Sequence, residues 1–274
     1  MTRKYYVVDR DTGENITDQV SVRTRDQDEG YRKALDKERF LLAEKGRHWV
    51  ASYHDAVTEV SRLLTLTETG AIIKLLPYMR FKAHGKLIKD GKALKQSDIQ
   101  RIFKRGKTAT VDLLRTLEDK GVISVVKEGR SNAYYISARF HEMGNVDTAA
   151  SFTKLYQVRT REITDDLDLN EAGVLYKILP YFHYSECVLV ANPNEADIDA
   201  LEYLDNGELA DRVGLDRSHL TRTVAKLRSK GAIMTTTSGR TTRYYVHPDL
   251  MYRQARNTDT ADAVRTMFDR HRKS

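Results

Sequence analysis

The chain has little of what builds disulfide-bonded, thiolate-metal or membrane proteins. Cys187 is its single cysteine, which excludes an internal disulfide and any zinc site made of several cysteines. No run approaches the roughly 18 apolar residues of a membrane span, and residues 1–11 lack the apolar core of a signal peptide. We therefore expect a cytoplasmic protein without membrane contact, in which Cys187 is a buried, unreactive thiol.

Motifs for catalysis and cofactor binding are also missing. The sequence has no P-loop, no His-x-Glu-x-x-His pattern, no zinc-ligand spacing and no acidic cluster with metal-binding spacing. We therefore predict no enzymatic activity, no cofactor, and neither a catalytic nor a metal site. The scattered histidines are interpreted as packing or surface groups: His54, His141, His183 and His247.

Positive charge is in excess. Lys and Arg number 46 against 39 Asp and Glu, for a formal net charge of +7. This balance favours a polyanionic partner, although many basic proteins bind none. Hydrophobic residues at 40% and charged residues at 31% are typical of a globular protein, and 274 residues are enough for two domains.

The sequence repeats itself. Leu66–Tyr78 (LTETGAIIKLLPY) matches Leu169–Tyr181 (LNEAGVLYKILPY) at an offset of 103 residues, and Trp49–Tyr53 resembles Phe152–Tyr156 at the same offset. Two further pairs match at an offset of 110: Leu117–Ile123 with Leu227–Ile233, and Arg130–Ile136 with Arg240–Val246. A constant register on both sides of one seven-residue difference predicts a duplication with a single loop insertion.

Each copy predicts three helices followed by a β-hairpin. Thr67 and Asn170 are expected to cap the first helices, which stop at Pro77 and Pro180. The second helices are Gln96–Phe103 and Gly207–Val213; the third run from about Lys107 to Lys120 and from Arg217 to Lys230. The hairpin arms are Val122–Val126 with Ala133–Ile136, and Ile233–Thr237 with Arg243–Val246. Three helices with a β-ribbon make a winged helix.

The predicted fold class is mostly α with small β (α+β). Two tandem winged helix-turn-helix domains, related by internal duplication, follow a small N-terminal segment of β-hairpin and helix. In that segment, Lys4–Asp9 and Asn15–Val22 flank a turn, and Asp26–Gly46 is expected to be helical. The predicted boundaries are 1–47 for the N-terminal segment, 48–145 and 150–253 for the two winged helices, and 254–274 for a basic tail that forms a short helix.

The third helices carry the predicted DNA-binding chemistry. In a helix-turn-helix, the first residues of the second helix of the motif face base edges, while amides and basic side chains hold phosphates. The candidate contacts are Lys104, Arg105, Lys107, Thr108, Arg115 and Arg130 in the first copy, and Arg217, Ser218, His219, Arg222, Lys226, Arg240 and Arg243 in the second. Arg217 and Arg222 are favoured for base contacts, because arginine can bind guanine through two hydrogen bonds. The alternative is a solvated helix face.

The hairpins repeat a Gly-Arg-(Ser/Thr)-x-x-Tyr-Tyr pattern. An arginine at each tip, Arg130 or Arg240, can enter the minor groove or hold a flanking phosphate. We interpret the paired tyrosines as packing residues, because alternation along a strand buries one ring of each pair: Tyr134 with Tyr135, and Tyr244 with Tyr245.

The two copies differ in the sign of the charge that one corresponding segment carries. Residues 186–211 collect acidic side chains, namely Glu195, Asp197, Asp199, Glu202, Asp205 and Glu208, where the first copy has Lys82, Lys86, Lys89, Lys92 and Lys95. Because the acidic insertion repels phosphate, we expect a solvated loop facing away from DNA, or a surface for a protein partner. The first copy is expected to supply more of the nonspecific affinity.

Four repeated motifs resemble those of winged-helix proteins of Firmicute phages and plasmids. They are the aromatic-x-x-x-Tyr segment, the Leu-Pro-Tyr end of the first helix, the Leu-x-x-Lys-Gly-(Val/Ala)-Ile turn and the Tyr-Tyr-(Ile/Val) arm of the hairpin. RepL-type plasmid replication proteins are similar over residues 1–140, including the Asp-x-x-Thr-Gly-Glu element at Asp9–Glu14. The resemblance implies a DNA-binding protein of a mobile element, associated with the host nucleoid. Tandem winged helices also resemble the architecture of iteron-binding plasmid initiators.

Three hypotheses follow. The first is a sequence-specific double-stranded DNA-binding transcription regulator, such as a repressor. The second is a replication initiator or partition protein that binds repeated origin sites. The third is an enzyme acting on DNA, or a tandem winged helix that binds only protein. The sequence leaves open whether the chain forms a homodimer, whether residues 186–211 hold a protein partner, and whether it senses a small molecule.

Overall fold

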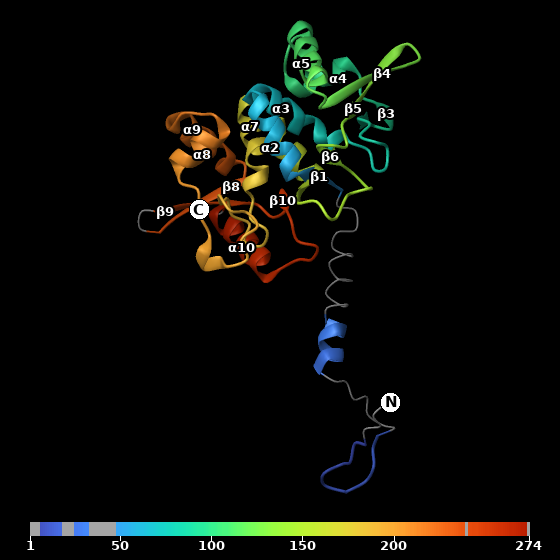
Figure 1. Ribbon diagram of the computed structural model, residues 1–274, viewed down its shortest axis with the longest axis vertical. Helices are drawn as coiled ribbons and strands as arrows, with labels where there is room; N and C mark the ends of the chain where they lie inside the picture. The colour runs from blue at the N-terminus through green and yellow to red at the C-terminus, as the bar shows by residue number, and fades with distance from the viewer. Residues whose placement is uncertain (1–5, 18–24, 33–47, 239–240, 273–274) are drawn as a thin grey trace. The chain divides into compact units, whose positions relative to one another are not determined.

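The computed structural model describes residues 6–17, 25–32, 48–238 and 241–272. The chain divides into two units, residues 1–45 and residues 46–274. The fold combines helices with small antiparallel sheets (Figure 1).

In the first unit, residues 6–17 turn back on themselves. Val8 bridges Asn15 in antiparallel fashion, and the Asp9 carboxylate accepts hydrogen bonds from the backbone N–H groups of Asp11 and Thr12. Gly13 has a φ of 73°, which glycine adopts without steric cost. The turn predicted around Asp11 is therefore present. Residues 25–32 are helical, which covers the start of the predicted helix, whereas residues 33–47 lie outside the described part.

The first copy has a strand, four helices, two hairpins and a closing strand. In chain order these elements are β1 (Trp49–Tyr53), α2 (His54–Leu63), α3 (Leu66–Leu75), the 3-10 turn η1 (Leu76–Tyr78), β2 (Ile88–Lys89), β3 (Lys92–Ala93), α4 (Gln96–Phe103), α5 (Lys107–Asp119), β4 (Ile123–Glu128), β5 (Ser131–Ile136) and β6 (His141–Glu142). Neither β1 nor α2 was predicted from the sequence.

The second copy repeats this order. Its elements are β7 (Phe152–Tyr156), α6 (Gln157–Asp165), α7 (Leu169–Lys177), η2 (Leu179–Tyr181), η3 (Ile198–Ala200), α8 (Asn206–Val213), α9 (Arg217–Ser229), β8 (Ile233–Ser238), β9 (Thr241–Val246), β10 (Met251–Tyr252) and the additional helix α10 (Asp259–Arg272). The segment with η3 replaces the β2–β3 hairpin, so the inserted residues lie where the repeats change register. The matched elements support the predicted duplication.

The predicted caps of the first helices were wrong by two residues. Thr65 caps α3 and Asp168 caps α7, and each forms a capping box with the glutamate three positions later, Glu68 or Glu171. The structure gives Thr67 and Asn170 another role: the Thr67 hydroxyl donates a hydrogen bond of 2.6 Å to Asn170 Oδ1 across the two helices.

The two copies share one core. Strands β1 and β7 pair at the centre of an antiparallel sheet with the order β10-β7-β1-β6. Helices α3 and α7 pack side by side between the α4–α5 pair (green) and the α8–α9 pair (orange) (Figure 1). Their contact is close enough that a Cβ atom on Gly70 would lie 1.7 Å from the Leu169 carbonyl oxygen. The predicted ranges 48–145 and 150–253 thus mark two halves of one compact unit.

The β4–β5 and β8–β9 hairpins bury one tyrosine of each pair, as predicted. Tyr134 and Tyr244 are buried, whereas Tyr135 and Tyr245 are half-buried. The hairpins are tied to the preceding loops by matched hydrogen bonds of 2.9 Å, from Leu87 N–H to Tyr134 O and from Leu189 N–H to Tyr244 O.

Helix α10 confirms the short helix predicted in the tail. Arg265 anchors it by an ion pair with Asp249, which lies outside the helix, and Phe268 is buried beside His247. The helix is therefore packed on the second copy.

Candidate nucleic-acid interface

Helices α4 and α5 form a tight helix-turn-helix. Helix α4 ends because Lys104 adopts a left-handed conformation with φ of 53°. After a turn that ends at Gly106, α5 buries Leu114 and Leu117 and leaves Val111 half-buried, close to the predicted stripe. The opposite face of α5 is exposed.

The start of α5 collects positive charge. Lys104, Arg105, Lys107 and Thr108 are all exposed there. Gly106 is the N-cap residue and offers no side chain to the first-turn N–H groups. Uncapped N–H groups and the helix dipole favour a negative ligand, so this end of α5 suits a phosphate.

Helix α9 repeats the arrangement with a different first turn. Its apolar stripe of Leu220, Val224 and Leu227 is buried, as predicted. The N-cap is Asp216, whose carboxylate accepts hydrogen bonds from the Ser218 hydroxyl (2.7 Å), the His219 backbone N–H (2.8 Å) and His219 Nδ1 (2.5 Å). The hydrogen bond from Ser218, followed by the one from the His219 backbone, holds the pKa of Asp216 well below its usual range. Ser218 and His219 are thus engaged with the cap.

Arginines cover the exposed face of α9. Arg217, Arg222 and Arg228 are exposed, and Arg222 and Arg228 form no ion pair with a residue of the described segments. The Arg217 guanidinium lies over the first turn of α8, where a Cβ atom on Gly207 would approach its Nη2 to 2.4 Å. Arg228 was not predicted as a contact, although it follows Arg217 by about three helical turns and therefore lies on the same side of α9 as Arg217.

Two predicted contacts hold the fold together instead of facing solvent freely. Lys226 Nζ pairs with the Glu171 carboxylate of α7 at 2.6 Å, and this carboxylate raises the pKa of Lys226. The Arg243 guanidinium lies 4.2 Å from the centre of the Tyr203 ring and is half-buried. These side chains join α9 and the β8–β9 hairpin to the rest of the second copy.

The remaining candidates divide by position. Arg115 is exposed on α5, and Arg130 is exposed at the tip of the β4–β5 hairpin beside Gly129, whose φ is 60°. Arg240, at the tip of the other hairpin, lies outside the described residues.

The basic loop of the first copy is mostly exposed. Lys82, Lys89, Lys92 and Lys95 are exposed, as the prediction of a basic surface requires. Lys86 is different, because its ammonium group donates to both oxygens of Glu128 at 2.6 and 2.7 Å.

The acidic insertion is folded on one side and solvated on the other. Val188, Val190 and Leu201 form a buried cluster against Tyr203 and Tyr245, and Val190 bridges Tyr203. The exposed side carries Asp197, Asp199 and Glu202 around Ile198, which is 55% exposed. The prediction of a simple solvated loop therefore holds only for the outer side.

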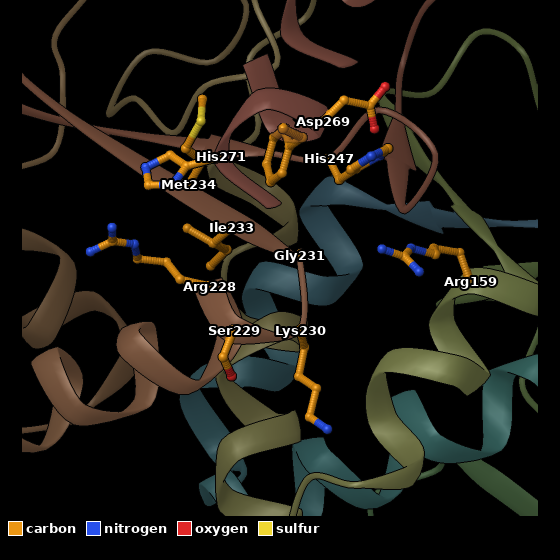
Figure 2. Close-up of a pocket in the computed structure, with 11 residues that line it drawn as sticks. Arg159, Arg228, Ser229, Lys230, Gly231, Ile233, Met234, His247, Asp269 and His271 are labelled. Carbon is orange, nitrogen blue, oxygen red and sulfur yellow. The ribbon is translucent and has the colours of Figure 1, made fainter. Parts of the chain in front are cut away.

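A polar cavity of about 420 Å³ lies between α9 and α10. Its lining includes Arg159, Arg228, Met234, His247 and Asp269, and Figure 2 shows Arg159 reaching toward Gly231 from the side opposite Arg228. Burial lowers the pKa of His247 to about 4, so this imidazole is neutral at pH 7. Of the lining residues, Ser229 donates its hydroxyl to the Lys226 carbonyl oxygen, and Lys230 pairs with Asp166.

Cys187 is buried, as predicted, and burial raises the pKa of its thiol to about 12. Within the described segments, no three His, Cys, Asp or Glu side chains gather so that they could hold a metal ion. None of the described helices is both long and apolar enough to cross a membrane. No protein-family model, curated protein or solved structure matches the chain.

Proposed function

We propose that this chain is a sequence-specific double-stranded DNA-binding regulator with two winged helix-turn-helix units, in which α5 and α9 are the reading helices. One observation carries the proposal. Both copies present the second helix of a tight helix–turn–helix with its entrance exposed and with basic side chains on its exposed face, and a β-hairpin follows each. This is the arrangement that places a helix in the major groove and a wing beside it.

The two reading helices contribute differently. Helix α5 has few arginines but an uncapped, basic entrance, which suits phosphate contacts. Helix α9 has a neutralised entrance and exposed arginines along its length, which suits base contacts. Sequence discrimination is therefore assigned chiefly to Arg217 and Arg222.

Binding-site selection from genomic fragments at about 0.15 M salt, the physiological range, tests the proposal. Wild type is expected to recover a discrete site, and Arg217→Ala with Arg222→Ala to weaken binding to it by about tenfold to a few hundredfold. The matched control is Arg62→Ala with Arg161→Ala, which removes the same charge from exposed positions on α2 and α6. Equal loss in both variants, or no enriched site, would contradict the proposal.

The salt dependence separates the two helices. Lys104→Ala with Lys107→Ala is expected to reduce the slope of log affinity against log salt by about 2, since each phosphate contact contributes about 0.9. The Arg217 and Arg222 double variant should change the slope less and sequence preference more. Equal slopes in the two variants would count against this division. A site over a promoter would support regulation, and an array near an origin would favour replication initiation.

A further inference from the structure

The sheet register relates the two copies by a two-fold axis. Trp49 matches Phe152 in the repeat, and Tyr53 matches Tyr156. In the β1–β7 pair these partners are exchanged: Trp49 faces Tyr156 and Tyr53 faces Phe152. Such an exchange places the axis through the central pair, Ala51 and Lys154, which are themselves matched residues.

The outer strands, β6 and β10, are related by the same two-fold axis. Strand β6 pairs with β1 by placing His141 opposite Ser52, and β10 pairs with β7 by placing Met251 opposite Leu155. Ser52 matches Leu155 at the offset of the first half of the repeat, and His141 matches Met251 at that of the second. All four strands of the sheet are therefore arranged symmetrically.

Helices α3 and α7 meet in the same symmetric way. A Cβ atom on Gly70 would strike the Leu169 carbonyl oxygen at 1.7 Å, and one on Gly173 would strike that of Leu66 at 2.1 Å. Gly70 matches Gly173 and Leu66 matches Leu169, so each contact is the image of the other. Thr67 and Asn170, another matched pair, are hydrogen-bonded to each other.

Equivalent helix contacts in the two copies connect each reading helix to α3 or α7. Helix α4 packs on α3 and on α5, while α8 packs on α7 and on α9. The hydrogen bonds that fix the hairpins, Leu87 to Tyr134 and Leu189 to Tyr244, are also matched. Helices α5 and α9 therefore follow the same two-fold relation, with their N-terminal ends in corresponding positions.

We propose that a single chain reads one DNA site made of two half-sites in inverted orientation and of different sequence. The inference rests on the proposed DNA-binding function. Two-fold protein symmetry is matched by inverted symmetry in a DNA site. The half-sites differ because the exposed side chains differ at matched positions: Ala109 against His219, Asp112 against Arg222, and Arg115 against Ala225.

The test starts with selection of sites from a random duplex library by the full-length protein. Synthetic duplexes then carry the two selected blocks in the selected arrangement, with one block reversed, or singly. The inverted arrangement is expected to bind at least about tenfold more tightly than the direct one at every spacing tried, because reversal loses the base contacts of one helix. Sedimentation should find one chain on each inverted site.

The selection and the binding comparison distinguish failure of the proposed DNA-binding function from failure of the inverted-site inference. If no discrete motif is enriched, the DNA-reading function itself fails. A discrete motif whose direct arrangement binds as well as the inverted one, or an inverted site that holds two chains, would overturn the inverted-site inference alone.

A symmetrised variant gives a second, independent measurement. It copies exposed residues from the N-terminal part of α9 onto exposed positions of α5 with the substitutions Gly106→Asp, Lys107→Arg, Thr108→Ser, Ala109→His, Asp112→Arg and Arg115→Ala. These positions are all exposed, so circular dichroism should show a folded protein. The variant should select a perfect palindrome built from the half-site of α9, and selection of a direct repeat of that half-site would refute the inference.

Discussion

At the scale of single residues, buried polar groups distinguish the two halves of the core. His141 is fully buried, with Nδ1 3.0 Å from Ser52 Oγ and Nε2 3.0 Å from the Tyr176 hydroxyl. The matched residues are apolar: Met251 for His141, Leu155 for Ser52, and Ile73 for Tyr176. The histidine therefore joins the sheet of the first copy to helix α7 of the second through a hydrogen-bonded chain that has no counterpart.

This burial makes the stability dependent on pH. Desolvation lowers the pKa of His141 to about 3 in the folded state, from the ordinary value near 6.5. The unfolded chain binds the proton more readily, so stability is lost as pH falls from about 6.5 toward 3 and is unaffected by this group above pH 7. His141 alone should cost about 2 kcal/mol between pH 7 and pH 5.

Urea unfolding of His141→Asn at the two pH values checks this expectation. The variant should be less stable at pH 7, because Ser52 and Tyr176 lose a partner, but its loss between pH 7 and pH 5 should be smaller by about 2 kcal/mol. His84→Asn is the matched control, because His84 is exposed and asparagine tolerates its φ of 50°. An unchanged pH dependence in His141→Asn would show that the pKa of His141 is the same in the folded and unfolded states.

At the scale of elements, the glycines between α3 and α7 set how closely the copies approach. Gly70→Ala or Gly173→Ala is expected to destabilise the protein by about 2–4 kcal/mol, because the new Cβ meets backbone that cannot rotate away. Gly106→Ala is the control, since a Cβ atom there meets open space and only a weak cap is changed. Equal midpoints in chemical denaturation for the control and the two core variants would contradict the close packing.

A carboxylate at the N-cap of α5 or α9 should increase the stability of the fold and decrease its affinity for DNA. Gly106→Asp gives α5 the cap that Asp216 gives α9, so it should stabilise the fold by a few tenths of a kcal/mol. The added carboxylate should weaken DNA binding by up to about fivefold, since a charge at a helix end contributes about 0.3–1 kcal/mol. Asp216→Gly should have the opposite effects.

Gly106→Asn separates the two contributions. Asparagine caps a helix about as well as aspartate but carries no charge. It should stabilise the fold slightly less than Gly106→Asp, which adds a favourable charge at the helix end, and should bind DNA more tightly than that variant, with both differences shrinking as salt rises. If both variants bind DNA equally, the entrance of α5 does not face phosphate.

Elements fixed by local signals were predictable, and those fixed by distant partners were not. Helices α4, α5 and α9 follow from periodicity and turn residues within a few positions of their ends. The capping boxes of Thr65 and Asp168 also have a local signal, a glutamate at the third position, which the prediction of Thr67 and Asn170 overlooked. The central β1–β7 pair was missed, because its strands are short and lie about a hundred residues apart.

The candidate site shows the same division. Helical periodicity alone predicts that Arg217 and Arg222 lie off the buried stripe, and both are exposed. Nothing near Lys226 or Arg243 in sequence reveals Glu171 or Tyr203, the partners that engage them. Exposure is thus a local property, whereas availability to a ligand depends on the tertiary fold.

At the scale of the whole molecule, the shared sheet predicts that residues 46–274 unfold as one cooperative body. Trp49 is the single tryptophan and lies at the junction of the copies, stacked on Phe152 with ring centres 6.0 Å apart. Its fluorescence therefore reports on the junction, whereas far-ultraviolet circular dichroism reports on the helices of both copies. If neither half is stable without the β1–β7 pair and the α3–α7 contact, the two signals must change together.

Denaturation of the full chain is accordingly expected to show coincident transitions for the two signals. A fragment of residues 46–147 should not fold as a monomer, because separation leaves β1 without its central partner and exposes the face of α3 that Gly70 belongs to. Sedimentation of the fragment should find unfolded chain or a symmetric dimer, in which a second copy of β1 takes the place of β7. A stable folded monomer, or two separate transitions in the full chain, would show that each copy is an independent domain.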